Sequence, residues 1–151
     1  KRIKGIVKVT SPLFEVPLTI IPGIGTGAAY ASGDAFGTSG VIEVPKEGTI
    51  TKAIFFDYDD EGLPKEMVLF KHPFVATADN GAFDPTDADL RNCVGVLNFD
   101  TWFNYTSNQM GVIIPALDYS APQGKLYFQF VTRGADNIAA GAIPEFSLVI
   151  G

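Results

Sequence analysis

The chain consists of short apolar runs, rich in Val, Ile, Phe, Tyr and Thr, which glycine and proline interrupt at close intervals. In residues 125–132 every second side chain (Leu126, Phe128, Phe130) shares one face of an extended strand, which we assign to the core. Such punctuated runs are typical of an all-β chain. The pattern predicts strands over residues 3–9, 14–21, 40–44, 49–57, 66–71, 94–99, 111–115, 125–132 and 145–150, with shorter pieces at 28–30 and 34–37.

One short segment has the signature of a helix. Asp84 precedes Pro85, and this pair indicates an N-cap followed by proline at the first helical position. Asp87 adds an acidic residue in the first turn. The pattern predicts a helix over residues 85–92 that carries Leu90 and Cys93 toward the core.

Many short strands with a single helical turn indicate a two-sheet β-sandwich, which we expect to be jelly-roll-like. A small β-barrel is the main alternative. Pro17 lies inside the predicted strand 14–21 and lacks a backbone N–H, so this strand either lies at a sheet edge or is broken in two.

The length of 151 residues predicts one β domain, residues 1–151, whose first 27 residues could include an extended arm. No apolar run approaches the length of a membrane span, and the polar opening KRIKGIVKV is unlike a signal peptide, so we expect no membrane association. The single cysteine excludes a disulfide framework within the chain and fits assembly in a host cytoplasm. The net charge of −6 argues against a nucleic-acid partner.

The basic residues are unevenly distributed along the chain. Lys1, Arg2, Lys4 and Lys8 all precede the first acidic residue, so a basic N-terminal segment joins an acidic body. We hypothesise that these four residues contact an acidic surface of a partner or a neighbouring subunit.

Two acidic segments could hold Ca²⁺. The first, Asp57 to Glu61, resembles the start of a calcium loop, but position twelve of that loop is Val68 in place of the required glutamate. We therefore interpret it as the solvated tip of a hairpin. The second segment offers further side-chain oxygens, from Asp79, Asn80, Asp84, Asp87 and Asp89. Helix capping and Asx-turns also explain why these residue types occur there. We predict no metal and no other cofactor.

No catalytic set stands out. Residues 22–27 are glycine-rich, but they lack the lysine and the spacing of phosphate-binding loops, so a flexible loop or arm is expected. His72, the only histidine, has no serine in a nucleophile-elbow pattern to act with, and we place it at a strand end. Cys93 lies among apolar residues and is interpreted as a small core residue. The chain is predicted not to be an enzyme.

Trp102, Phe103 and Tyr105 form an aromatic cluster with polar neighbours. Such a cluster is found in core packing, at subunit interfaces and in platforms that bind sugars. All three interpretations remain open from the sequence.

Five short motifs follow one another along the middle of the chain. They are Ser32-Gly33-Asp34-Ala35-Phe36-Gly37, a Met-Val-Leu-Phe strand ending at Phe70, Asp79-Asn80-Gly81-Ala82-Phe83, Asp87-Ala88-Asp89-Leu90 and Val94-Gly95-Val96. In this order, they resemble motifs of small structural proteins of tailed bacteriophages. The resemblance extends over roughly residues 28–99, while the C-terminal third matches only in being β-rich.

The resemblance implies a virion structural component, and among such roles a head decoration (cement) protein is favoured. Its partners would be the major capsid protein and further copies of itself, in a homo-oligomer that could be a trimer, on the exterior of the phage head. Residues 1–10 and 22–27 would engage neighbours as arms or added strands. The alternative is a tail, fibre or baseplate module that recognises host glycans, and a glycan-cleaving enzyme is the least favoured reading.

Overall fold

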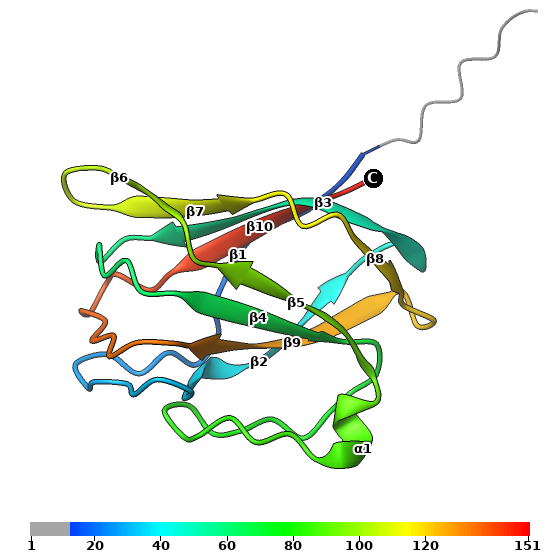
Figure 1. The fold of residues 1–151 in the computed structure, drawn as a ribbon, viewed down its shortest axis with the longest axis horizontal. Coiled ribbons are helices and arrows are strands. Elements are labelled where there is room, and N and C mark those ends of the chain that lie inside the picture. The colour runs from blue at the N-terminus through cyan, green and yellow to red at the C-terminus, as the bar shows by residue number, and fades with distance from the viewer. Residues whose placement is uncertain (1–12) are drawn as a thin grey trace, which may run out of the picture.

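Two antiparallel sheets lie face to face in the computed structural model, which describes residues 13–151 (Figure 1). The six-stranded sheet has the order β1-β10-β3-β7-β6, with β8 also paired to β3, and the four-stranded sheet has the order β2-β9-β4-β5. The strands are β1 (Phe14–Ile20), β2 (Ala35–Glu43), β3 (Glu47–Asp57), β4 (Lys65–Phe70), β5 (Cys93–Phe99), β6 (Trp102–Asn104), β7 (Gln109–Ile113), β8 (Leu117–Ser120), β9 (Lys125–Thr132) and β10 (Glu145–Ile150).

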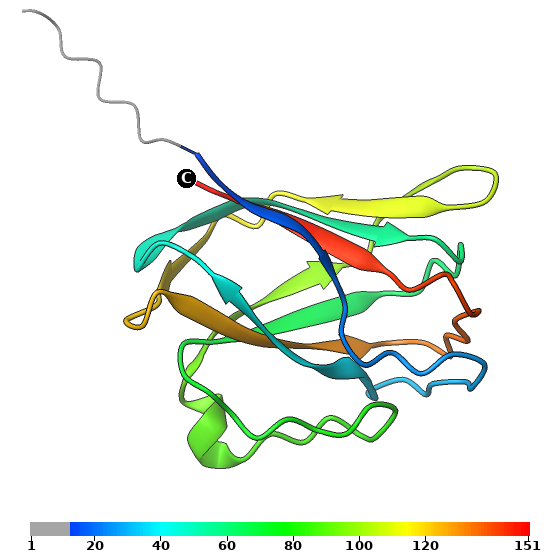
Figure 2. The same cartoon turned by 180° about the vertical axis from the view of Figure 1, so that it is seen from behind.

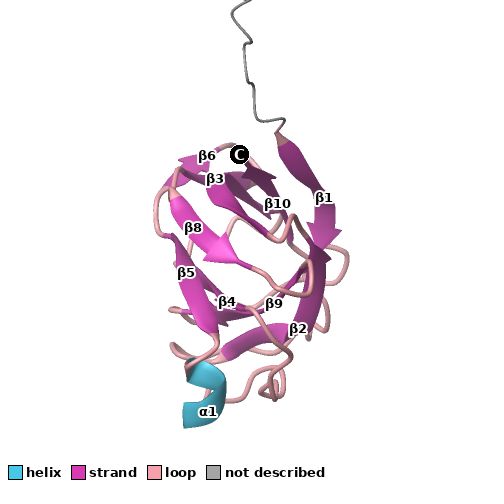
Figure 3. Cartoon of the chain, turned by 90° about the vertical axis from the view of Figure 1, so that its right-hand side faces the viewer, coloured by secondary structure: helices cyan, strands magenta, loops and turns pink. Residues whose placement is uncertain are grey.

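This arrangement is the predicted β-sandwich, and its jelly-roll variant stays a prediction. The layers are seen from a second direction in Figure 3, where the single helix α1 (Asp87–Leu90) projects from one end. The first and last described strands, β1 and β10, are paired neighbours. The edge strands β1 and β2 lie on the side of the molecule that Figure 2 presents.

The core between the sheets is dominated by phenylalanine. The predicted inward set of β9, Leu126, Phe128 and Phe130, is at most 1% exposed, which confirms that prediction. Rings from the two sheets meet directly, because Phe128 of the four-stranded sheet lies edge-on to Phe146 of the six-stranded sheet at 5.1 Å between centroids. The largest fully buried aromatic side chains are Phe36, Phe55, Phe70, Phe99, Phe128, Phe130 and Phe146.

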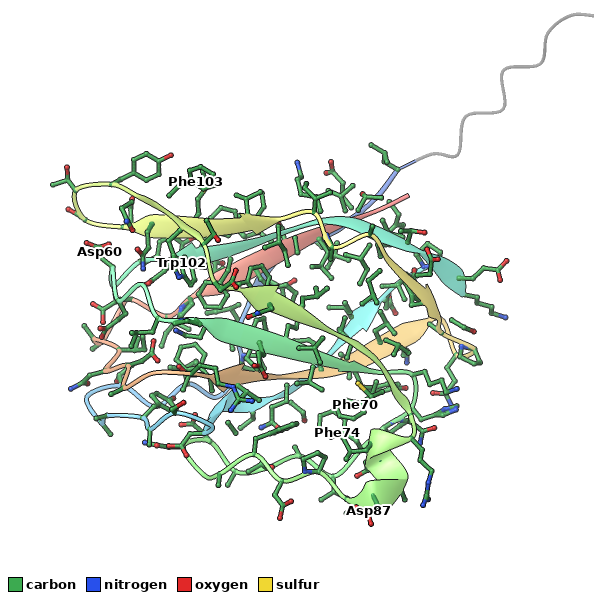
Figure 4. The ribbon with its side chains drawn as sticks, in the orientation of Figure 1. Asp60, Phe70, Phe74, Asp87, Trp102 and Phe103 are labelled. Atoms are coloured by element: carbon green, nitrogen blue, oxygen red, sulfur yellow. The ribbon has the colours of Figure 1, made fainter. Side chains whose placement is uncertain are left out.

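The outer face of the four-stranded sheet is buried around Val68, Phe70 and Val131. Residues 71–92 fold over it, and Phe74 of this segment stacks on Phe70 of β4 with 4.2 Å between ring centroids (Figure 4). The side chain of Gln129, on the outward side of β9, is fully buried there. It accepts from Thr77 N (3.0 Å) and donates to Thr77 O (2.6 Å) and Gly37 O (3.1 Å). In the second half of β9 the outward residues Gln129 and Val131 are therefore buried as well as the inward ones.

The strand predictions agree with the structure except in the short elements. The predicted pieces 34–37 and 40–44 are one strand, β2, with a register irregularity between Phe36 and Gly40. Strands β6 and β8 were not predicted, and residues 28–30 form no strand. Pro17 lies in the edge strand β1, where the register shifts between Val16 and Thr19, as expected for a proline that cannot donate. The predicted strand 3–9 lies outside the described residues.

The helix prediction was correct in place but wrong in detail. Thr86, and not Asp84, is the N-cap, and its Oγ1 accepts from Asp89 N at 3.1 Å. Leu90 is 50% exposed, so it does not face the core. The physical reason is length, because a helix of four residues turns too little to bury one side. Cys93 begins β5 and packs against the cluster on the outer face of the four-stranded sheet.

No helix among residues 13–151 is long and apolar enough to cross a membrane.

Candidate interaction surface

The two outer faces of the sandwich differ in how far other segments of the chain pack over them. Residues 71–92 cover the part of the four-stranded sheet's outer face that holds Val68, Phe70 and Val131, whereas the outer face of the six-stranded sheet is not covered by any described segment (Figures 1 and 3). Side chains that point outward from the six-stranded sheet are therefore available for contacts with another molecule.

An apolar row crosses this uncovered face from edge to edge. Residues paired directly in an antiparallel sheet lie on the same face. Register therefore places Ile20 of β1 beside Glu145 of β10, then Phe56 of β3, Met110 of β7 and Phe103 of β6. The solvated face of a sandwich usually carries polar residues, and here only Glu145 of the five is polar.

The aromatic residues gather at one end of this row. We use the name aromatic patch for Phe56, Tyr58, Phe103, Tyr105 and Met110. Phe103 is 51% exposed and Tyr105 is 55% exposed, while Tyr58 is 40% exposed. Clustered exposure of large apolar side chains marks contact surfaces in soluble proteins, whereas isolated exposed residues need no explanation.

The structure separates the three aromatic residues that the sequence grouped together. Trp102 faces the core, where its ring lies edge-on to Phe55 at 5.6 Å between centroids. Phe103, the next residue of β6, points to the opposite side of the sheet (Figure 4). Tyr105 follows in the β6–β7 turn, where its N–H donates to Asn108 O at 2.9 Å. The aromatic patch thus contains Phe103 and Tyr105 but not Trp102.

A shallow cavity of about 140 Å³ lies within the aromatic patch. Its lining residues are Phe56, Tyr58, Tyr105, Asn108, Gln109 and Met110. Tyr58 Oη donates to Glu145 Oε1 at 2.7 Å, so the ring of Tyr58 is fixed in place. The cavity combines ring faces with the side-chain amides of Asn108 and Gln109, which suits a side chain or a sugar ring more than an extended ligand.

The hydroxyl of Tyr58 makes the free energy of unfolding depend on pH in the alkaline range. Burial, followed by the hydrogen bond to Glu145 and its charge, raises the pKa of Tyr58 to about 12. The unfolded chain ionises its tyrosines near pH 10, so between about pH 10 and pH 12 unfolding releases a proton and stability falls as pH rises. We expect Tyr58→Phe to reduce this fall, measured by urea denaturation from pH 9 to pH 11. An unchanged slope in Tyr58→Phe would contradict the assignment.

The first acidic segment is not a hairpin tip in the structure. It connects β3 to β4, which belong to different sheets, so the hairpin interpretation was wrong. Asp57 is 3% exposed and accepts from the N–H groups of Asp59, Glu61 and Gly62. Its Oδ2 also accepts from Gln109 Nε2 at 2.6 Å. The sequence did not indicate that one carboxylate accepts from three N–H groups of this connection.

The second acidic segment also serves the fold. Asp79 accepts from Gly25 N (2.9 Å), Tyr30 Oη (2.7 Å) and Gly37 N (2.8 Å), and so ties the glycine-rich loop to β2. Asp89 Oδ2 accepts from Val75 N at 3.0 Å. Within residues 13–151 no cluster of three or more acidic, histidine or cysteine side chains is arranged to hold a metal ion.

The sequence also singled out His72 and four basic residues near the N-terminus. His72 lies two residues beyond the end of β4, as predicted for a strand-end residue. Lys1, Arg2, Lys4 and Lys8 lie outside the described residues, so their proposed contacts stay a prediction.

Phe56, Tyr58 and Met110 were missed as members of the site. A signal for Phe56 was present in the run Ile54-Phe55-Phe56, because consecutive apolar residues put a large side chain on both faces of a strand. Tyr58 and Met110 gave no such signal, because only the pairing of β3 with β7 brings them together.

In comparisons with known proteins, no family model matches the chain, and searches of curated proteins and of solved structures returned no match.

Proposed function

We propose that this chain is a non-enzymatic structural protein of a tailed-bacteriophage particle, of the capsid decoration type, which makes subunit contacts through the aromatic patch. The observation that carries the proposal is the uncovered apolar row on the six-stranded sheet, with the aromatic patch at its end. The ordered motifs of residues 28–99 supply the phage context. A decoration protein needs a rigid domain with a face that docks on its neighbours, and a sandwich with one uncovered apolar face has that form.

The composition of the patch favours a protein partner over a glycan. Phenylalanine and methionine have no polar atom to offer to sugar hydroxyls, whereas both are enriched at protein interfaces. Phe56, Phe103 and Met110 make up most of the patch. The partner would be the major capsid protein or a second copy of this chain, with the basic residues Lys1, Arg2, Lys4 and Lys8 contacting an acidic shell.

The alternative, a tail, fibre or baseplate module that binds host glycans, rests on the cavity of about 140 Å³. Tyr58, Tyr105 and Asn108 line it and offer two ring faces and an amide. A glycan module predicts measurable binding of polysaccharide and few copies at the tail, whereas a decoration protein predicts many copies on the head.

The proposal predicts that the double variant Phe103→Ser/Tyr105→Ser loses association. Both side chains are about half exposed, so the free energy of unfolding should change by roughly 0.5 kcal/mol or less. Removing two interface aromatics should weaken self-association or binding to undecorated heads at least about tenfold. Sedimentation velocity and a co-sedimentation assay with heads measure the two effects.

Val75→Ser is the matched control. Val75 is 72% exposed but lies in the segment that covers the other sheet, so its replacement should leave association unchanged. Equal association by the double variant and the wild type would remove the aromatic patch from the proposal.

A further inference from the structure

A lysine and an aspartate lie in contact inside the protein, apart from the exposed residues of the aromatic patch. Lys65, the first residue of β4, is 2% exposed, and Asp136, in the segment after β9, is 1% exposed. Lys65 Nζ lies 2.6 Å from Asp136 Oδ2. Lysine and aspartate are almost never fully buried unless they are paired, and a subunit contact on the outer face of the six-stranded sheet does not explain why such a pair is placed inside the protein.

The surroundings of the amine are aromatic. Lys65 Nζ lies 5.1 Å from the centroid of the Phe36 ring and 5.9 Å from that of Phe55. Its other polar contact is Leu63 O, at 2.7 Å. The amine is therefore held by one carbonyl and directed at one carboxyl group, with bulk water excluded.

The two oxygens of the Asp136 carboxyl group have different partners. Oδ2 faces the lysine, while Oδ1 accepts a hydrogen bond from the hydroxyl of Thr132, which is itself fully buried. Gly134 N donates to Thr132 Oγ1 at 3.3 Å and helps to orient this hydroxyl. An amine, a carboxyl carbon and a donor to the second carboxyl oxygen are thus assembled in one dry site.

The protonation of the pair suits a reaction between its members. Burial lowers the pKa of Lys65, although the charges of Asp136, Asp57 and Glu61 act in the opposite direction. Transfer of a proton from the ammonium group to the carboxylate turns the ion pair into a neutral amine and a carboxylic acid, which a low dielectric favours. Hydration normally keeps amines and acids ionised and apart, and this site removes that hydration.

We propose that Lys65 and Asp136 condense to an intramolecular isopeptide bond. The lone pair of the neutral amine attacks Cγ of the Asp136 carboxylic acid, and the Thr132 hydroxyl stabilises the charge that develops on Oδ1. The Nζ–Cγ bond forms and the Cγ–Oδ2 bond breaks. Oδ2 leaves as water with its own proton and one from the amine, and no oxidant or reductant is needed. The amide keeps one N–H, which donates to Leu63 O.

The bond would close a covalent loop from residue 65 to residue 136 and tie β4 to the segment that leads from β9 into β10. A cross-link over so long a stretch restricts the unfolded chain strongly. Resistance to forced unfolding is its expected consequence, whether or not the protein is a virion component.

The test is the mass of the intact wild-type chain under denaturing conditions. We expect a deficit of one water molecule, and a tryptic digest with a branched peptide that joins Lys65 to Asp136 and lacks cleavage after Lys65. Lys65→Arg should have the full mass calculated from its sequence. A full mass for the wild type, or a water loss confined to one linear peptide such as an aspartyl succinimide, would overturn the proposal.

Thr132→Val tests the positioning role of the hydroxyl. This replacement keeps the side-chain shape but removes the donor to Oδ1. In freshly purified protein, bond formation followed by mass should slow about 100-fold. Equal rates in the variant and the wild type would remove Thr132 from the mechanism.

Discussion

Replacing Phe55 with alanine is expected to lower the free energy of unfolding by about 4 kcal/mol. Phe55 is 1% exposed and its ring meets those of Phe99, Trp102 and Phe130 at 5.6–5.7 Å between centroids. Phe99 and Phe130 belong to the four-stranded sheet, whereas Trp102 belongs to the six-stranded one. Truncation therefore leaves a cavity at the contact between the sheets, and urea denaturation measures the loss.

Phe55→Leu is the matched variant, because it retains most of the apolar volume. This replacement should lower the free energy of unfolding by roughly 1.5 kcal/mol or less. A loss below about 1 kcal/mol for Phe55→Ala would contradict the central position of this ring.

The Phe55 variant also bears on the aromatic patch. Trp102 packs on Phe55, and Trp102 and Phe103 are neighbours in the three-residue strand β6. Loss of the contact between Phe55 and Trp102 is expected to loosen β6. The proposed subunit contact made by Phe103 should then weaken, even at temperatures where the chain remains folded. The core and the surface are linked by the alternation of side chains along one short strand.

Replacing Asp57 with alanine is expected to lower the free energy of unfolding by about 3 kcal/mol, because several hydrogen-bond donors lose a charged acceptor. Gln109 is the most affected partner. It is 3% exposed, and its side-chain amide donates to Asp57 Oδ2 at 2.6 Å. The backbone N–H groups of Glu61 and Gly62 lose the same oxygen. Denaturation at pH 7 measures the change in the free energy of unfolding.

Asp60→Asn is the control for this prediction. Asp60 lies in the same connection but is exposed, and its φ of 53° is one that asparagine adopts readily (Figure 4). The control should change stability by roughly 0.5 kcal/mol or less. If Asp57→Ala and Asp60→Asn were equally stable, the role of Asp57 as the anchor of the β3–β4 connection would be wrong.

The sequence was sufficient to predict the long strands. Strands β9 and β10 were predicted with the boundaries that the structure has, because their alternation of apolar residues is regular and long. Strands β6 and β8 were missed because they contain three and four residues, with too few positions to establish a period of two. Their existence depends on pairing with β7 and β3, which a local pattern does not contain.

The candidate site could be predicted only in part. The aromatic cluster was found, but alternation within β6 sends Trp102 inward and Phe103 outward, and the strand itself was not foreseen. Phe56 and Met110 join them through the register of β3 with β7. Likewise, Lys65 and Asp136 are far apart in the chain, and only the folded sandwich brings them into contact.

The most direct test of the proposed function is cryo-electron microscopy of the phage particle to which the proposal assigns this chain. The account predicts density for the sandwich at regular capsomer junctions on the head, with Phe103 and Tyr105 buried against a neighbouring subunit. Density confined to the tail would contradict the decoration role and favour glycan recognition. A head-bound sandwich whose six-stranded sheet faces solvent would instead contradict the assignment of the aromatic patch as the contact surface.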